Sequence, residues 1–177
     1  NVPIIEDAAE SLGASYGVKK CGSFGEMAIL SFNGNKIITT SGGGMLLSNN
    51  QKYIKKARKL ASQAKEDYLH YEHVELGYNY RMSNIIAAIG RAQLKVLDKY
   101  VQLRRGIFNY YKENLIENKN IDFMPEPDGS FSTRWLTVLQ INKNSKFSVN
   151  SLINHLINKN IESRPVWKPM HLQPLYK

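Results

Sequence analysis

Short hydrophobic runs dominate the first part of the chain. They lie at residues 2–6, 26–32 and 44–48, and each is bounded by polar or glycine-rich segments. Continuous apolar runs of this length are typical of strands buried on both faces of a parallel or mixed sheet. The pattern therefore predicts an α/β fold in which helices cover such a sheet.

Helical spacing of hydrophobic residues follows these runs. Asn49 and Asn50 are candidate caps for a helix that extends to about residue 65, and Ser83 is the candidate cap of the next. From there, apolar residues recur every three or four positions. This predicts one long helix, or two in series bent near Asp98 or Gly106.

The last third of the chain has a different organisation. The segment 125–129, Pro-Glu-Pro-Asp-Gly, is a dense turn signal, and we interpret it as the entry to a second lobe. A strand over 134–142, a helix over 148–158 and an extended segment over 161–167 are predicted after it. These elements indicate a small α/β lobe.

Composition narrows the class of protein. The 177 residues are 42% hydrophobic and 22% charged, which favours a packed core over disorder. No apolar stretch approaches the roughly 18 residues of a membrane span, so no membrane partner is predicted. The chain opens without Met on what reads as a strand already in progress, and we expect it to be a piece of a longer polypeptide.

Charge and cysteine content add two expectations. The formal charge of +9 suggests an anionic partner, such as nucleic acid, an acidic membrane or a phosphorylated small molecule. The densest basic group, residues 52–59, has helical spacing and is best explained as a solvated helix face. The single cysteine, Cys21, excludes an internal disulfide and favours the cytoplasm. His70 and His73 have no third ligand at a familiar spacing, so no metal site is predicted.

Candidate chemistry is concentrated between residues 7 and 45. Asp7 stands at the carboxyl end of the first predicted strand, where α/β sheets bind ligands. Ser31 and Lys36 follow the second, ahead of the flexible glycine turn 42–44. A strand-end Asp is usually a cap, and a single lysine is usually a surface residue. Their occurrence in this order indicates an amine that could form a Schiff base with an aldehyde cofactor.

Four motifs carry a resemblance to a known family. They are Glu-Asp-Ala-Ala-Glu-Ser-Leu-Gly-Ala at 6–14, Ser-Phe-Asn-Gly-Asn-Lys at 31–36, Gly-Tyr-Asn-Tyr-Arg-Met-Ser-Asn at 77–84 and Arg-Pro-Val-Trp-Lys-Pro-Met-His at 164–171. With them, the chain resembles the DegT/DnrJ/EryC1/StrS sugar aminotransferases from end to end. The resemblance implies a fragment of a fold-type-I aminotransferase. Residues 1–100 would be part of the large domain that binds pyridoxal 5'-phosphate (PLP), and residues 101–177 a connecting helix and an incomplete small domain.

The resemblance also implies cofactor contacts. Asp7 matches the aspartate that pairs with the pyridine nitrogen of PLP, which keeps the ring an effective electron sink. Glu10 matches a position beside the cofactor ring, Ser31 the serine that binds its phosphate, and Lys36 the Schiff-base lysine. Asn79 matches an asparagine that reaches the cofactor phosphate of a neighbouring subunit, which implies a homodimer with shared sites.

Substrate residues and substrate class follow in the same way. Arg81, Arg164 and His171 resemble residues near the substrate pocket. The stretch 34–41 looks most like enzymes of the bacillosamine pathway, which aminate a UDP-linked 4-keto-6-deoxy-N-acetylhexosamine with glutamate as donor. Other keto-sugar specificities stay open, and Lys36 argues against the family's dehydratases, which carry His there. From another class, a basic nucleic-acid-binding module is the alternative, although we expect the tyrosines at 68–80 to form a subunit interface and predict no nucleic-acid partner.

Overall fold

The computed structural model describes residues 2–176, which divide into two compact units. The first contains the chain up to Glu113 together with Pro125–Thr137, and the second contains Asn114–Met124 and the chain from Val138 onward. The turn at 125–129 therefore lies in the first unit, and the second unit resumes after it. The division at residue 100 into a cofactor domain and a small domain stays a prediction.

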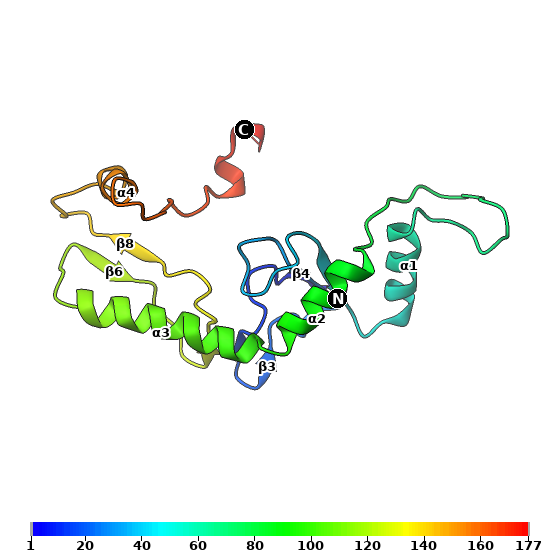
Figure 1. Ribbon diagram of the computed structural model, residues 1–177, viewed down its shortest axis with the longest axis horizontal. Coiled ribbons are helices and arrows are strands. Elements are labelled where there is room, and N and C mark those ends of the chain that lie inside the picture. Colours follow the sequence, from blue (N-terminus) through cyan, green and yellow to red (C-terminus); the bar gives the residue numbers. More distant parts are fainter. Residues whose placement is uncertain (1, 177) are drawn as a thin grey trace. The chain divides into compact units, whose positions relative to one another are not determined.

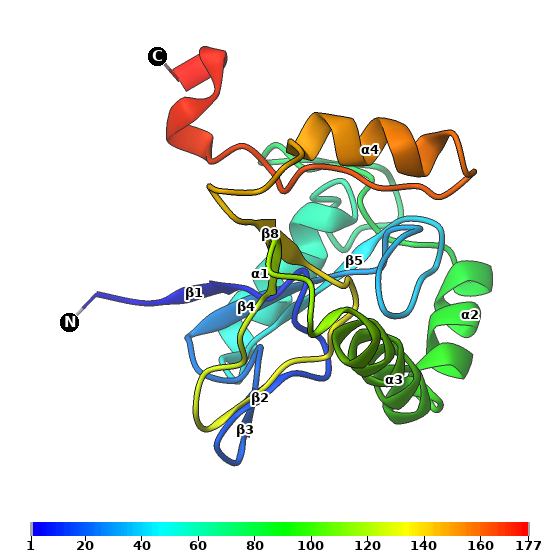
Figure 2. The same ribbon diagram turned by 90° about the vertical axis from the view of Figure 1, so that its left-hand side faces the viewer.

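A three-stranded mixed sheet organises the first unit. Its strands, in the order β1-β4-β5, are β1 (Ile5–Asp7), β4 (Met27–Ser31) and β5 (Gly44–Leu47) (Figures 1 and 2). β1 is parallel to β4, and β5 is antiparallel to it. All three predicted strands exist, and the sheet is mixed as expected.

The two faces of this sheet differ in burial. Ala28 and Leu30 of β4 are buried, and Leu30 belongs to a core cluster with Ala8, Phe32 and Ile38. On the opposite face, Ile5 is 62% exposed and Leu46 is 37% exposed. The expectation of strands buried on both faces is therefore not met within residues 2–176, because these residues cover one face only.

Three helices follow the sheet: α1 (Gln51–Ala61), α2 (Asn84–Leu94) and α3 (Leu97–Leu115), whose last two residues belong to the second unit. As predicted, the side chain of Asn50 caps α1 by accepting from Lys52 N, and that of Ser83 caps α2 by accepting from Ile86 N. The prediction of two helices in series is confirmed: the break lies at residues 95–96, close to the expected Asp98, whereas α3 continues without interruption through Gly106.

A second small sheet in the first unit was not predicted. It has the order β3-β2-β7, from β2 (Ser15–Tyr16), β3 (Lys19–Lys20) and β7 (Ser130–Phe131). Both pairings are antiparallel. The pairing of β2 with β7 attaches the segment after the 125–129 turn to the loop that follows β1.

The second unit is a small α/β arrangement. β6 (Ile121–Phe123) and β8 (Leu139–Ile141) form an antiparallel pair, and α4 (Val149–Ile157) follows. A reciprocal capping box formed by Ser148 and Ser151 stabilises the start of α4. Two 3₁₀ turns come last, η1 (Met170–Leu172) and η2 (Pro174–Tyr176). Among residues 2–176, no helix combines the length and apolar character that crossing a membrane requires.

Candidate active site

The loops after β1 and β4 meet at the side chain of Lys36. Its Nζ lies 3.0 Å from Oε1 of Glu10, in an ion pair that also has hydrogen-bond geometry. The Lys36 side chain is 12% exposed and that of Glu10 is 45% exposed. The structure thus brings together two of the predicted site residues, which come from different strand ends.

The loop that carries Lys36 is part of the core. Ile38 and Thr40 are only 2% and 4% exposed. Thr40 N donates to Phe32 O over 2.9 Å, and Phe32 N donates to Gly43 O over 3.0 Å, which closes the base of the loop. Gly43 allows this closure because its φ is +93°, a value that disfavours any side chain.

A glutamine from α2 fixes the same loop. Gln93 accepts from Thr39 N through Oε1 over 2.9 Å and donates from Nε2 to Thr39 O over 2.6 Å. One side chain therefore satisfies both backbone groups of a residue three positions from Lys36. Sequence reasoning missed this role, although Gln93 lies in the helix that the 77–84 motif begins.

Two adjacent acids at the end of β1 have different environments. Glu6 accepts hydrogen bonds from the backbone of Gly22, Phe24 and Gly25. Burial raises the pKa of Glu6, but these hydrogen bonds outweigh it and leave the pKa below its usual value. Asp7 is exposed, and its carboxylate accepts from Ala9 N over 3.2 Å. Glu6 consequently holds a loop, whereas Asp7 presents a carboxylate at the sheet edge.

Ser31 lies on the same sheet face as Asp7. Asp7 stands opposite Ile29 in the parallel register, and Ser31 follows Ile29 by two residues. Because side chains alternate along a strand, Asp7, Ile29 and Ser31 project from one face. An acid and a hydroxyl thus share the carboxyl edge of β1 and β4, and the loop to Lys36 starts there.

An aromatic ring completes the surroundings of the lysine. Lys36 Nζ lies 4.6 Å from the centroid of the Trp135 ring. Trp135 was not predicted as a site residue, since its segment reads only as a strand. No local signal reveals this contact, because it depends on how residues 125–137 pack against the rest of the first unit, which precedes them in sequence.

Asn79 and Arg81 belong to the segment that joins α1 to α2. Residues 62–80 form an arm beside α1 (Figure 1), and Asn79 pairs with Ser62 in an antiparallel bridge at its base. Arg81 is exposed. Within the described part of the chain, no hydrogen bond or ion pair connects either residue to Lys36 or Glu10. A role for them at this site stays a prediction.

The remaining predicted substrate residues belong to the second unit. Arg164 forms an ion pair of 2.6 Å with Glu162 at the surface, and His171 is in η1. Their relation to Lys36 stays a prediction. In the arm, His70 contacts Glu72 and His73 contacts the carbonyl of Gln63. Residues 2–176 contain no group of three His, Cys, Asp or Glu side chains arranged to hold a metal ion.

Comparison with known proteins identifies the family. Residues 1–177 match the DegT/DnrJ/EryC1/StrS aminotransferase family. The chain belongs to this family. EpsN of Bacillus subtilis, whose own assignment as a pyridoxal phosphate-dependent aminotransferase is provisional, is 55% identical over 99% of this chain and 45% of EpsN.

Further relatives of this DegT/DnrJ/EryC1/StrS chain are named for sugars linked to different nucleotides. A GDP-perosamine synthase of Escherichia coli O157:H7 is 39% identical over 99% of this chain and 47% of the relative. A UDP-4-amino-4,6-dideoxy-N-acetyl-beta-L-altrosamine transaminase of Campylobacter jejuni is 33% identical over 100% of this chain and 48% of the relative. The chain spans about half the length of the curated relatives it matches.

Solved structures confirm the fold class. The aminotransferase TlmJ of Streptoalloteichus hindustanus superposes with a TM-score of 0.90 at 26% identity, over 99% of this chain and 48% of TlmJ. Spr1654 of Streptococcus pneumoniae, whose assignment as a sugar aminotransferase is provisional, gives in its PLP form a TM-score of 0.88 at 25% identity, over 99% of this chain and 46% of Spr1654. The predicted fragment of a fold-type-I aminotransferase is confirmed.

Proposed function

We propose that the complete protein uses PLP held by Lys36 to transfer an amino group from an amino acid, glutamate, to a nucleotide-linked 4-keto-6-deoxy sugar. The observation that carries this proposal is the contact between Lys36 and Glu10, 3.0 Å long, which joins the loops after two parallel strands. Ligands of open α/β sheets bind at this edge. Membership of an aminotransferase family supports the same chemistry.

The residues at this edge fit the cofactor. Asp7 offers an exposed carboxylate for a pyridine nitrogen, Ser31 a hydroxyl on the same sheet face for a phosphate, and Lys36 an amine for an aldehyde. When bound, PLP supplies an electron sink that stabilises negative charge on the carbon next to the amino group. We propose Asn79 of a second copy as a further phosphate ligand.

Lys36 also moves the proton in this proposal. In its neutral form, Nζ would take a proton from the α-carbon of the donor and return it within the same half-reaction to the carbon that carried the aldehyde. In the second half-reaction the same amine would take that proton back and deliver it to the sugar carbon that receives the amino group. Positioned proton transfer of this kind contributes typically about 10²–10⁴-fold to a rate. Glu10 is well suited to hold the ammonium form, because its Oε1 lies 3.0 Å from Nζ.

Residues 34–41 support a more specific substrate than membership of the family alone. We propose a UDP-linked N-acetylhexosamine as substrate, based on the resemblance of residues 34–41 to the bacillosamine-pathway enzymes. Arg81, Arg164 and His171 would contact it in a homodimer with shared sites. The net charge of +9 suits a diphosphate-bearing substrate. We propose that the protein acts in the cytoplasm, where the thiol of Cys21 would stay reduced.

Borohydride fixation tests the chemistry. The full-length protein is incubated with PLP, reduced, digested and mapped by mass spectrometry, which should find the cofactor on Lys36. Lys36→Ala should abolish fixation, whereas the matched Lys65→Ala on the exposed arm should not change it. Cofactor fixed at another lysine in Lys36→Ala would contradict the assignment.

Amination of keto-sugars tests the substrate. UDP-, GDP- and dTDP-linked 4-keto-6-deoxy sugars are compared with glutamate as donor. We expect the UDP-linked N-acetylhexosamine to react fastest. Reaction with only the GDP- or dTDP-linked sugars would reject the UDP assignment and leave the role of Lys36 intact.

A further inference from the structure

The ammonium group of Lys36 has two partners in the structure, and only one of them is a carboxylate. The second is the ring of Trp135, whose centroid lies 4.6 Å from Nζ. Trp135 is half-buried, and the Lys36 side chain is 12% exposed. A cation within about 6 Å of an indole face is attracted by the ring quadrupole, more strongly when water is excluded.

We propose that Trp135 is a positioning residue for Lys36, holding its amine against the ring so that Nζ stays at the sheet edge. This inference rests on the proposed function of Lys36. A lysine side chain has a flexible four-carbon stem, and ordering it costs rotamer entropy. Contacts on two sides, to Glu10 and Trp135, restrict that freedom and fix the direction of the amine.

The two residues before Trp135 are buried within the first unit. Thr133 and Arg134 are 2% and 8% exposed, although both are polar. Arg134 has a φ of +51°, a left-handed conformation that is unfavourable for a residue with a side chain. Surrounding contacts must therefore impose this conformation, and they set the point from which Trp135 projects.

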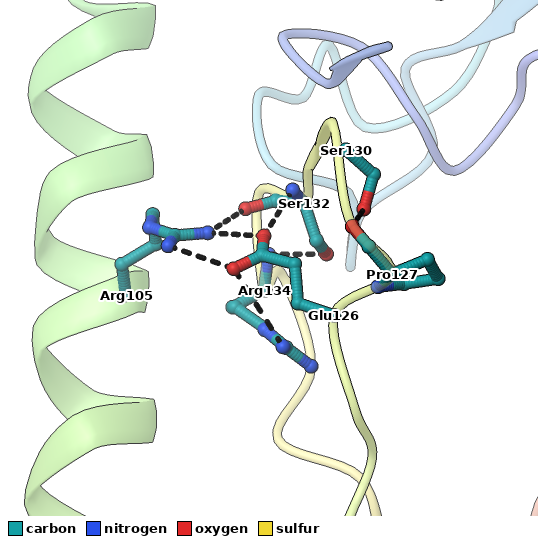
Figure 3. A network of polar contacts seen from close by, with 6 residues as sticks. All are labelled: Arg105, Glu126, Pro127, Ser130, Ser132 and Arg134. Carbon is teal, nitrogen blue, oxygen red and sulfur yellow. Dashed lines mark hydrogen bonds and ion pairs between the residues drawn. The ribbon is translucent and has the colours of Figure 1, made fainter.

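Those contacts form a clamp around Glu126, drawn in Figure 3. Arg105 of α3 binds the carboxylate of Glu126 with two hydrogen bonds of 2.7 and 3.0 Å, and it donates to Ser132 O over 2.6 Å. Ser132 N donates to Glu126 over 2.6 Å. Bidentate, charge-assisted bonds of this kind are strong and directional.

Arg134 contributes to the clamp from the other side. Its guanidinium lies 4.0 Å from the ring centroid of Phe108, and its Nη2 is 3.9 Å from Glu126 Oε2. Both Phe108 and Arg105 come from α3, so one helix anchors the segment on both sides of Ser132. The clamp therefore fixes the residue next to Trp135, and Trp135 in turn contacts Lys36.

Amine labelling provides the test. The full-length protein, freed of cofactor, is labelled briefly with acetic anhydride, and modification of each lysine is measured by mass spectrometry. Lys65 is a matched internal reference, because its Nζ lies 4.5 Å from the ring of Tyr71, which is 78% exposed. The variants are Trp135→Met, which keeps apolar bulk without a ring, Trp135→Phe, which keeps a ring, and Trp167→Met as a tryptophan control.

Loss of the ring should expose the amine. We expect Trp135→Met to raise the labelling rate of Lys36 relative to Lys65 between about 2- and 30-fold, the range of a cation–π contact. Trp135→Phe should restore the rate to within about threefold of the unmodified protein, and Trp167→Met should not change it. Equal rates in the Met and Phe variants would overturn the proposal. A rise at Lys36 and Lys65 together would assign Trp135 to general packing and overturn it as well.

The two proposals fail differently. If borohydride attaches the cofactor to a residue other than Lys36 in the unmodified protein, the proposed function fails whatever the labelling ratio. If the cofactor is on Lys36 and the labelling of Lys36 is the same in Trp135→Met, only the role of Trp135 is wrong.

Discussion

Two irregular segments of the first unit are held in opposite ways. The loop of residues 33–43, which carries Lys36, contains Ile38 and Thr40 at 2% and 4% exposure. The arm of residues 62–80 contains Leu69 and Tyr71 at 106% and 78% exposure. The first segment is part of the core, whereas the second, apart from the buried Ala64 at its base, lies mostly on the surface.

The contacts that hold these two segments in place also differ. Gln93, 54 positions away from Thr39 in sequence, holds the lysine loop through two hydrogen bonds to the backbone. The arm is closed at its base by backbone hydrogen bonds over short sequence distances, among them Gln63 N to Tyr78 O over 2.9 Å and Tyr78 N to Leu60 O over 2.8 Å. Ion pairs of Lys56 and Lys59 in α1 with Glu66 and Glu75 add to them. A reactive amine needs a fixed environment, whereas an exposed arm with aromatic side chains suits contact with another surface, here the proposed second copy.

The largest effect should come from Gln93→Leu. This change leaves the part-buried N–H and C=O of Thr39 without the Gln93 side chain as partner, and each such loss costs roughly 1–3 kcal/mol where water cannot replace the bond. We expect the free energy of unfolding of the full-length protein, measured by urea denaturation, to fall by about 2–4 kcal/mol. Borohydride fixation of the cofactor on Lys36 should slow in parallel.

The matched control is Gln102→Leu on the exposed surface of α3. It replaces the same side chain without removing any bond to the lysine loop, so its effect on unfolding should stay within about 0.5 kcal/mol. Equal destabilisation by the two substitutions would mean that Gln93 does not fasten the loop.

Two helical glycines distinguish tight packing against the lysine loop from an open helix surface. A Cβ at Gly90 would lie 2.9 Å from Thr40 Cγ2, while a Cβ at Gly106 would meet nothing within 4 Å. Gly90→Ala should therefore overpack the lysine loop and lower stability by about 1–3 kcal/mol. Gly106→Ala should raise it by about 0.5–1 kcal/mol through helix propensity. Thermal unfolding measures both, and stabilisation by Gly90→Ala would disprove close packing of α2 on the loop.

Acid should loosen the clamp next to Trp135. The hydrogen bond from Arg105 holds the pKa of Glu126 at about 2, against the effect of burial and below its usual 4.5, with help from Ser132 N–H. A carboxyl with a depressed pKa in the folded state stabilises the fold fully above pH 4.5 and loses that contribution as the pH falls toward 2. The contribution at neutral pH is up to about 3 kcal/mol.

Urea denaturation of the unmodified protein and of Glu126→Gln between pH 7 and pH 3 measures this contribution. The unmodified protein should be more stable at pH 7, and the difference should shrink as the pH drops below 4.5. A difference independent of pH would show that the charge of Glu126 is not what holds the segment.

Local signals were enough to predict much of the scaffold. The caps Asn50 and Ser83 mark helix starts in the sequence because a capping side chain bonds a backbone N–H two or three residues away. The strands at 27–31 and 44–47 were predicted from their apolar runs. The division into two helices in series was predicted within a few residues of its position at 95–96, because the apolar spacing there allowed a bend near Asp98.

Long-range contacts account for what was missed at the site. Lys36 and Glu10 follow strand ends, so their proximity follows from a parallel sheet. The contact with Trp135 requires β7 to pair with β2 and Glu126 to meet Arg105, and two-residue strands carry too little pattern to be detected. Glu6 was read only as part of a strand-end acid pair, whereas its role depends on the three backbone N–H groups of a later loop.

The smallest effect should come from Glu75→Gln in the arm. Hydrogen bonds from Lys56 and Lys59 lower the pKa of Glu75, but all three side chains are partly exposed, from 27% at Glu75 to 56% at Lys56. Exposed ion pairs contribute little to global stability and are screened by salt. We therefore expect an unchanged urea midpoint, with amide hydrogen exchange of residues 62–80 faster by about twofold at low salt and equal to the unmodified protein near 1 M salt. A midpoint shift as large as that of Gln93→Leu would make the arm as integral to the fold as the lysine loop, and the contrast between the two segments would be wrong.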